Sequence, residues 1–248
     1  MQKEYPITRH LFKQNKSLKA VKNLSFKLFP GETLGLVGES GCGKSTLSRA
    51  LVNLDTPTSG TIYYDGQELS VLDRSIRKEI QLVFQDPFAA LHPLKTIGDA
   101  IAEPLRVHRL VNDKKQCAER VMTLLEQVGM EADFYDRYPH ELSGGQRQRV
   151  VIARALATEP RLLILDEAVA ALDISVQAQV LNLLNDLKKE LQLSYLFISH
   201  DLNVVKYMAD RIMVMEKGIL VEEGEADELY FHPKQPYTKD LIKALPII

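Results

Sequence analysis

The sequence lacks features that would place it in several common classes of protein. No apolar run approaches the roughly 18 residues that a membrane-spanning helix needs, and the opening residues MQKEYPITRH lack the apolar core of a secretory signal. Two cysteines, Cys42 and Cys117, are too few for a multi-bridge disulfide scaffold or a four-cysteine metal site. Their scarcity favours a reducing compartment such as the cytoplasm.

An excess of charge of one sign is also missing. The chain has 31 Lys and Arg residues against 33 Asp and Glu residues, which leaves a formal net charge of −2. Bulk nucleic-acid binding requires a strongly basic surface, so we expect no nucleic-acid partner. The 248 residues are 45% hydrophobic and 26% charged, as is typical of a globular protein with a sizeable core.

Short apolar runs alternate with helical patterns along most of the chain. The runs lie at 33–37, 82–84, 162–165, 195–198 and 212–215, and turn residues bound them. Such runs predict strands of a buried, mainly parallel sheet. Between the third and fourth runs, apolar residues from Val176 to Leu191 recur at spacings of three and four, which predicts an amphipathic helix. The predicted fold class is therefore α/β.

Two regions depart from this alternation. Residues 20–32 and 60–69 alternate in polarity around glycine turns, which predicts an antiparallel β subdomain. Residues 94–158 contain no convincing strand and predict an inserted helical subdomain. We therefore expect one domain over residues 1–248, with the α/β core in about 1–93 and 159–248 and the helical subdomain in about 94–158.

A glycine-rich loop follows the first predicted strand and precedes a predicted helix. Residues 38–45, GESGCGKS, match the phosphate-binding pattern G-x-x-x-x-G-K-[ST]. Glycines let the backbone wrap around phosphates, and the amide groups and helix N-terminus then face negative charge. Lys44 is expected to reach the phosphates of ATP and the Ser45 hydroxyl to bind Mg²⁺. The predicted phosphate-binding residues are Gly38, Glu39, Ser40, Gly41, Cys42, Gly43, Lys44, Ser45 and Thr46.

An apolar strand at 162–165 ends in two acidic residues, Asp166 and Glu167. Asp166 at the tip of a buried strand can hold Mg²⁺ beside the phosphates. Glu167 follows where a carboxylate could deprotonate the water that attacks the γ-phosphate. The pattern alone also fits a strand that ends in a solvated acidic turn. Beside a phosphate loop, the catalytic interpretation is favoured.

The segment LSGGQRQRVVIARAL at 142–156 narrows the class, because a phosphate loop alone is shared by many nucleotide-binding enzymes. With the other two motifs, it resembles an ATP-binding cassette (ABC) ATPase over almost the whole chain. A serine and two glycines at a helix start also form an anion-binding terminus. The resemblance implies that the γ-phosphate of an ATP held by a partner subunit is bound by Ser143, Gly144, Gly145 and Gln146.

Three further positions fit the same resemblance. Gln85 resembles the Q-loop glutamine, Asp173 resembles the D-loop aspartate that acts across a dimer, and His200 resembles the switch histidine. The resemblance then implies two overlapping sets of residues. The catalytic residues are expected to be Glu167, His200 and Gln85, and the Mg²⁺ ligands Ser45, Gln85 and Asp166.

An aromatic face is expected to stack on the adenine base. Family spacing places this aromatic several residues before Ala20. Phe12 is the predicted residue, and Tyr5 is the alternative.

Several segments look like the peptide and nickel importers within this family. They are LVGESGCGKSTL, VFQDP, SVQAQVLNLL and the C-terminal HPKQPYTKDLIKALP. The usual DEPTSALD of that group is DEAVAALD at 166–173, which resembles some nickel-transport subunits. This difference favours nickel or a metal–chelator complex as cargo, with oligopeptides as the remaining possibility.

The resemblance implies partners that the sequence itself does not contain. They are a second, paralogous ABC ATPase subunit, two transmembrane permease subunits and, indirectly, an extracytoplasmic substrate-binding protein. The chain is then expected at the cytoplasmic face of the membrane. The alternatives are a non-transport ABC ATPase of repair or translation and a non-hydrolysing regulatory ATP-binding module. The module would need to have lost Glu167, His200 or Ser143, and all of them are present.

Overall fold

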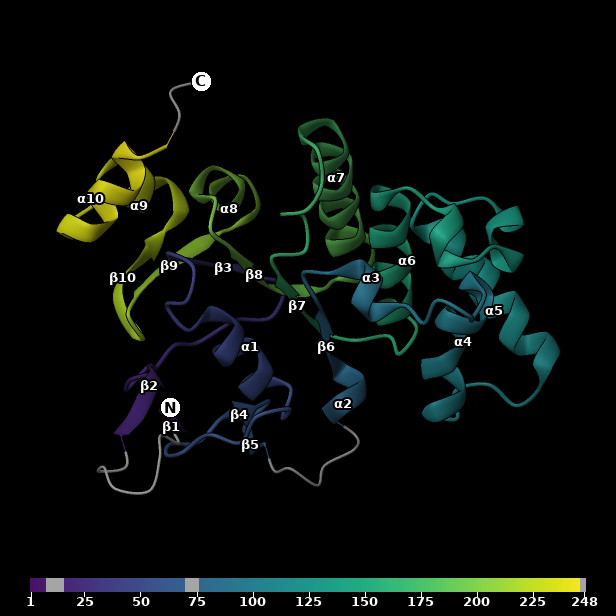
Figure 1. The fold of residues 1–248 in the computed structure, drawn as a ribbon, viewed down its shortest axis with the longest axis horizontal. Helices are drawn as coiled ribbons and strands as arrows, with labels where there is room; N and C mark the ends of the chain where they lie inside the picture. The colour runs from purple at the N-terminus through teal and green to yellow at the C-terminus, as the bar shows by residue number, and fades with distance from the viewer. Residues whose placement is uncertain (8–15, 70–75, 246–248) are drawn as a thin grey trace. The chain divides into compact units, whose positions relative to one another are not determined.

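The computed structural model describes residues 1–7, 16–69 and 76–245, and it has an α/β fold (Figure 1). Two compact units make up the chain. The first comprises Met1–Arg74 and Leu196–Ile248, and the second comprises Ser75–Tyr195. Across the described residues, no helix is both long and apolar enough to span a membrane.

A sheet with the strand order β10-β9-β3-β8 forms the centre of the first unit. Strand β3 (Thr33–Val37) pairs in parallel with β9 (Arg211–Glu216), which pairs antiparallel with β10 (Ile219–Glu225). Strand β8 (Ser194–Ser199) begins in the second unit and continues into the first. Every residue of β3 and β8 is buried, so the apolar runs predicted these strands for the physical reason given.

The helices of this unit include one that packs tightly on the central sheet. Helix α1 (Lys44–Leu51) follows β3, and helix α8 (Leu202–Met208) packs against β3. A Cβ atom on Gly35 would lie 2.3 Å from Cγ1 of Val205, so α8 approaches β3 as closely as a glycine permits. The yellow helices of Figure 1, α9 (Ala226–Phe231) and α10 (Pro236–Lys243), follow β10.

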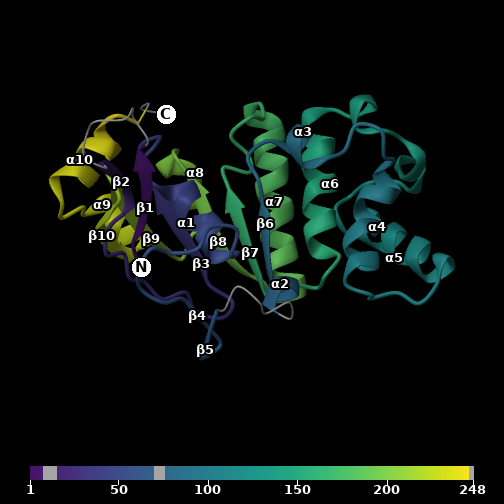
Figure 2. The ribbon, with the colours of Figure 1, turned by 60° about the horizontal axis from the view of Figure 1, so that its bottom comes forward.

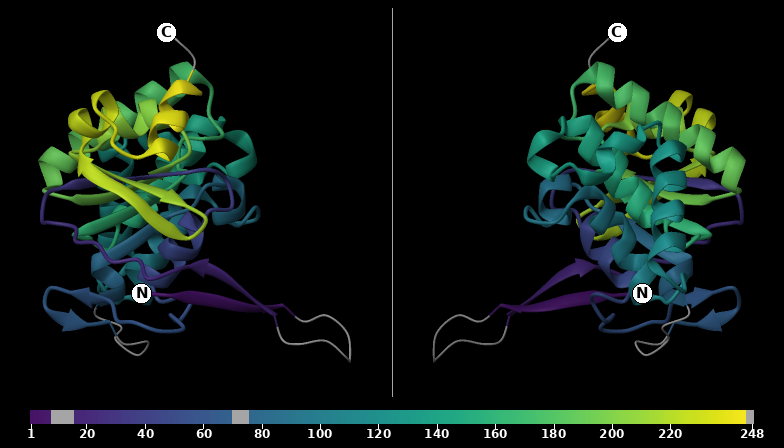
Figure 3. Two further views of the ribbon diagram at one scale, coloured as in Figure 1. Left: turned by 90° about the vertical axis from the view of Figure 1, so that its left-hand side faces the viewer. Right: turned by 90° about the vertical axis from the view of Figure 1, so that its right-hand side faces the viewer.

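Two small antiparallel pairs complete the first unit. Strand β1 (Lys3–Ile7) pairs with β2 (Lys16–Val21), forming the purple ribbon of Figure 3, and β4 (Tyr63–Tyr64) pairs with β5 (Gln67–Glu68). The second pair agrees with the predicted antiparallel region. The strand pattern over 20–32 was misleading, because β2 ends at Val21 and no strand follows before residue 33. Asn23 adopts a left-handed conformation with φ 46°, which is incompatible with a continuing strand.

The second unit combines a parallel strand pair with a group of helices (Figure 2). Strand β6 (Ile80–Val83) pairs in parallel with β7 (Leu162–Asp166), and α6 (Gly144–Leu156) packs against β6 and against α7 (Ile174–Leu191). Helices α4 (Ile97–Val107) and α5 (Lys114–Gln127) pack beside α6. The short elements of this unit are α2 (Ile76–Glu79), α3 (Pro87–Ala90) and the 3₁₀ turns η1 (Ala132–Asp136) and η2 (Pro139–Glu141).

Side-chain caps fix where the longer helices of the second unit begin. Thr96, Asp113, Ser143 and Asp173 each accept a hydrogen bond from a backbone N–H group of the first turn. Between residues 94 and 158 the structure contains helices and no strand, as the sequence predicted. The subdomain boundaries given above stay a prediction.

Candidate functional site

The phosphate loop, residues 38–45, connects β3 to α1 in the first unit. A Cβ atom on Gly38 would lie 2.1 Å from the carbonyl oxygen of Met215, and one on Gly43 would lie 2.3 Å from that of Ala20. Gly43 also has φ 112°, a conformation that other residues rarely adopt. Gly41, at φ 79°, would direct a Cβ into open space. The loop is therefore pressed against the strands on one side and open on the other, as a phosphate cradle requires.

Lys44 lies within this loop rather than pointing into solvent. Its Nζ donates hydrogen bonds to the carbonyl oxygens of Gly38 at 2.7 Å and Glu39 at 3.1 Å, and the residue is only 4% exposed. The amide of Cys42 donates to the same Glu39 carbonyl at 3.2 Å. Burial raises the pKa of the Cys42 thiol, so this side chain is a neutral packing residue at pH 7.

The two candidate adenine-stacking residues have different outcomes. Phe12 lies outside the described residues. Tyr5 lies on β1 and is half-buried, and its hydroxyl donates to Oδ2 of Asp55 at 3.0 Å. Burial raises the pKa of Tyr5, and a hydrogen bond with the Thr46 side chain acts in the opposite direction. The alternative aromatic, Tyr5, thus lies beside Thr46, which directly follows the phosphate loop.

His200 occupies the turn between β8 and α8. Asp201 caps α8 by accepting from the amide of Asn203 at 2.9 Å, and its own amide donates to the Ser199 hydroxyl at 3.0 Å. Because α8 packs on β3, this turn is anchored to the strand that leads into the phosphate loop. The His200 side chain itself is exposed.

In the second unit, parallel pairing brings Gln85 and Glu167 together. Val83 of β6 lies opposite Leu165 of β7, so both chains leave the sheet at the same edge. Nε2 of Gln85 donates to Oε2 of Glu167 at 3.1 Å. Glu167 has φ 50°, and strained backbone of this kind clusters at functional sites. Asp166, one residue earlier, is only 6% exposed.

The serine and glutamine of the LSGGQ segment bond to each other at the start of α6. The Gln146 amide donates to Oγ of Ser143 at 3.3 Å, and the Ser143 amide donates to Oε1 of Gln146 at 2.9 Å. This capping box leaves the amide groups of Gly144 and Gly145 at a helix N-terminus.

Asp173 is the N-cap residue of the next helix, α7. Its carboxylate accepts from the Val176 amide at 3.0 Å and from the Ser175 hydroxyl at 2.7 Å. These bonds, the one from Val176 foremost, lower the pKa of Asp173. The residue therefore acts as a helix cap in this chain, and its action across a dimer stays a prediction.

Glycine 145 marks the closest approach between α6 and α7. A Cβ atom on Gly145 would lie 2.3 Å from Cγ1 of Val176, whereas one on Gly144 would meet Leu172 at an ordinary 3.5 Å. Alanine is favoured over glycine by about 1 kcal/mol within a helix, but overpacking costs about 1–3 kcal/mol. We therefore expect Gly145→Ala to be less stable than Gly144→Ala, as measured by denaturant unfolding. Adding Val176→Ala should restore the loss, and equal stability of the two single variants would contradict the close packing.

The oxygen donors of these segments suit Mg²⁺. The described residues contain no group of three or more His, Cys, Asp or Glu side chains that could hold a metal ion. Mg²⁺ characteristically binds one or two protein oxygens together with substrate phosphates and water. The Ser45 hydroxyl, the Gln85 amide oxygen and the buried Asp166 carboxylate are donors of that kind. Each of these donors by itself suits an ion that arrives with its nucleotide, and their joint use as one Mg²⁺ site stays a prediction.

A pocket of about 890 Å³ lies within the second unit, lined by residues from β6, α3, α4 and α6. Its lining includes Gln85, Asp86, Ala89 and Ala90, and also Val107, which is 70% exposed. The segment DPFAAL at 86–91 therefore contributes to this groove.

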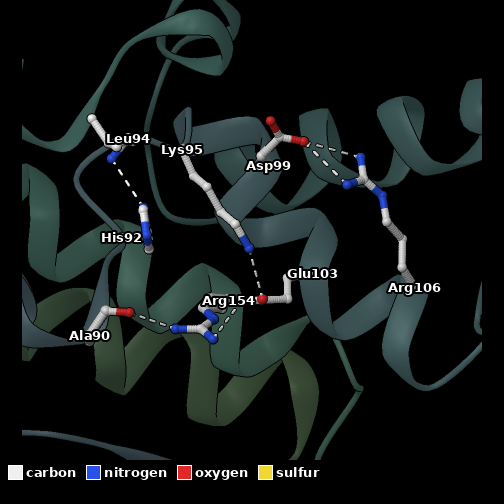
Figure 4. Close-up of polar contacts among 8 residues, drawn as sticks. All are labelled: Ala90, His92, Leu94, Lys95, Asp99, Glu103, Arg106 and Arg154. Carbon is white, nitrogen blue, oxygen red and sulfur yellow. Dashed lines mark hydrogen bonds and ion pairs between the residues drawn. The ribbon is translucent and has the colours of Figure 1, made fainter.

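Arg154, which lines this groove, bonds to residues of both α3 and α4 (Figure 4). It donates to the carbonyl oxygen of Ala90 at 2.7 Å and to Oε2 of Glu103 at 2.9 Å. Lys95 donates to the other oxygen of Glu103 at 3.0 Å, and this bond lowers the pKa of Glu103. The groove is thus lined by a charge-assisted hydrogen bond as well as by apolar residues.

Comparison with known proteins agrees with these motifs. The sequence model described as "ABC transporter" matches residues 21–170. The oligopeptide transport ATP-binding protein OppF of Bacillus subtilis is 50% identical over 97% of this chain and 81% of its own length. The dipeptide transport ATP-binding protein DppF of Haemophilus influenzae is 48% identical over 99% of this chain and 76% of its own length.

Solved structures give the same assignment. The dimeric, post-hydrolysis form of the ATP-binding cassette MJ0796, bound to ADP and Pi, matches with a TM-score of 0.79 at 31% identity. The match covers 91% of this chain and 96% of that one. The chain therefore belongs to the ATP-hydrolysing, ATP-binding subunits of the ABC transporter family.

Proposed function

We propose that this chain powers the import of oligopeptides. Its relatives OppF and DppF are named for oligopeptide and dipeptide transport. The expectation of a nickel cargo depends on the segment DEAVAALD, and the names of these relatives do not support it. Ala168 and Val169, which distinguish that segment, are 3% and 2% exposed, so they pack in the interior and do not contact a cargo.

The proposed hydrolysis uses the residues described above in separate roles. Lys44 binds the phosphates, and Glu167 takes a proton onto a carboxylate oxygen from the water that attacks the γ-phosphate. Gln85 orients Glu167 through their hydrogen bond. Ser45, Gln85 and Asp166 would hold Mg²⁺, which offsets the charge of the phosphates. His200 contacts the γ-phosphate. Phe12 stacks on the adenine base, with Tyr5 as the alternative residue for that role.

A second ATPase subunit completes the proposed site. The preformed N-terminus at Ser143 supplies amide groups suited to the γ-phosphate of a nucleotide on the partner. The similarity to a dimeric ATP-binding cassette supports this arrangement. The partner is proposed to be a paralogous subunit rather than a second copy.

The observation that carries the transport proposal is the position of Gln85. It lines the groove of the second unit and also bonds to Glu167. A permease segment bound in that groove would therefore contact the residue that holds the proposed base. We propose that two permease subunits dock through such grooves at the cytoplasmic face of the membrane, and that an extracytoplasmic binding protein delivers the peptide to them.

The test is ATP hydrolysis by this subunit reconstituted with its permeases and binding protein. We expect oligopeptides to stimulate the rate, and free or chelated nickel to leave it unchanged. Val107→Glu places a charge on the lining of the groove and should remove the peptide stimulation. The basal rate of the isolated subunit should stay at the wild-type value, since Val107 is 70% exposed and has no proposed role in hydrolysis.

The matched control is Tyr63→Glu on β4, which is 65% exposed and lies in the other unit. It should retain full stimulation. Stimulation by nickel and not by peptides would assign the other cargo. An ATPase that never associates with permeases would support one of the non-transport alternatives.

A further inference from the structure

We propose that Tyr237, in the C-terminal HPKQPYT segment at 232–238, is a positioning residue for the phosphate loop. Through one peptide unit it holds the carbonyl group that fixes the Lys44 ammonium. This inference rests on the proposed use of Lys44 in ATP binding. It adds a role for a segment that the other motifs leave unexplained.

The HPKQPYT segment is firmly attached to the first unit. The carboxylate of Glu222 on β10 accepts hydrogen bonds from the backbone amides of Lys234 at 2.7 Å and Gln235 at 3.0 Å. Pro236 begins α10, where a fixed φ and a missing N–H group are well tolerated. Thr238 is completely buried. Tyr237 thus lies between a backbone segment bonded to β10 and a completely buried residue.

The Tyr237 hydroxyl reaches the phosphate loop, although 198 residues separate it from Glu39. The backbone amide of Glu39 donates to the Tyr237 hydroxyl at 3.3 Å. This hydroxyl is the partner of the first peptide unit of the loop. The Glu39 amide therefore faces the C-terminal segment.

The same peptide unit holds Lys44 at its other end. The amide of Glu39 and the carbonyl of Gly38 belong to one planar, trans peptide, so they point in opposite directions. The Gly38 carbonyl accepts from Nζ of Lys44 at 2.7 Å. Tyr237 and Lys44 consequently bind opposite ends of one rigid peptide plane. Rotation of this plane would move the Gly38 carbonyl and, with it, the Lys44 ammonium group.

Tyr230 offers a matched comparison within the same C-terminal region. It lies on α9, and its hydroxyl donates to the Asn203 side chain at 2.9 Å. Both tyrosines are half-buried, and each makes one hydrogen bond between its hydroxyl and another element of the first unit. Removing either hydroxyl costs one such bond, but only Tyr237 bonds to the phosphate loop.

The experiment compares Tyr237→Phe with Tyr230→Phe in the full-length subunit. ATP dissociation constants are measured by titration, and the KM for ATP and kcat by steady-state hydrolysis. We expect Tyr237→Phe to raise the dissociation constant and KM about two- to tenfold, the range for one lost hydrogen bond. Its kcat should stay close to the wild-type value. Tyr230→Phe should bind ATP like the wild type while showing a similar change in thermal stability.

The outcomes separate this inference from the proposed function. Equal ATP affinity in the two variants and the wild type would overturn the role of Tyr237. An equal loss of affinity in both variants would also overturn it, because the effect would then be general destabilisation. A wild-type subunit that does not bind ATP would instead refute the proposed function. Tyr237→Ala, which also removes the ring, should weaken ATP binding at least as much as Tyr237→Phe.

Discussion

Replacing Glu167 with glutamine is expected to lower the ATP turnover number by about 10²- to 10⁴-fold, the usual contribution of a general base. An amide oxygen cannot accept the proton of the attacking water at neutral pH. The variant keeps the shape of the side chain and an oxygen that can accept from Gln85, which bonds to Glu167 at 3.1 Å. ATP binding should therefore survive, and a nucleotide-bound dimer should accumulate.

Hydrolysis is measured by phosphate release, and dimer formation by size-exclusion chromatography with ATP. Glu190→Gln makes the same chemical change at an exposed position of α7 and should hydrolyse ATP at the wild-type rate. If Glu167→Gln also turned over at that rate, Glu167 would not be the base. A loss of ATP binding in this variant would point instead to a structural role.

Replacing Lys44 with alanine should act at an earlier step, by weakening ATP binding itself. A hydrogen bond to a charged group contributes about 1.5–3 kcal/mol, which corresponds to a loss of affinity of about 10- to 150-fold. Lys44 is 4% exposed and its ammonium is held by two carbonyl groups of the loop, so water does not easily replace it in the same position. We expect the largest effect for ATP and ADP, because the β-phosphate is the shared contact.

Titration with ATP, ADP and AMP checks this expectation, since AMP affinity should change little. Lys189→Ala removes a lysine from the exposed face of α7 and serves as the control for the loss of charge. Wild-type affinity of Lys44→Ala for ATP would exclude the loop as the phosphate site.

Local patterns predicted the strands and the phosphate loop because both depend on neighbouring residues. Strand β3 coincides with the apolar run at 33–37, and its burial on both faces is what such a run indicates. Gly38 and Gly43 are required because a Cβ atom at either position would lie less than 2.5 Å from a carbonyl oxygen of another strand. The spacing of these glycines is visible in the sequence, although the strands that require them are not.

Long-range contacts were beyond prediction from one sequence. Gln85 and Glu167 are 82 residues apart, and only the register of β6 against β7 explains why their side chains bond. The hydrogen bond between Tyr237 and the Glu39 amide could not be predicted, because a backbone amide carries no side-chain signal. The failed strand at 22–32 has a different cause, since Asn23 takes a backbone conformation that a polarity pattern does not encode.

The contact between Gly145 and Val176 has a mechanical consequence. Two helices that approach this closely cannot slide past each other without a clash, so we expect the starts of α6 and α7 to move as one rigid body. The N-cap residues Ser143 and Asp173 lie at these two starts, and their separation should stay constant during such a movement. A neighbouring subunit that engaged one cap would therefore meet the other in a fixed register, and we expect a larger residue at position 145 to require a smaller one at position 176.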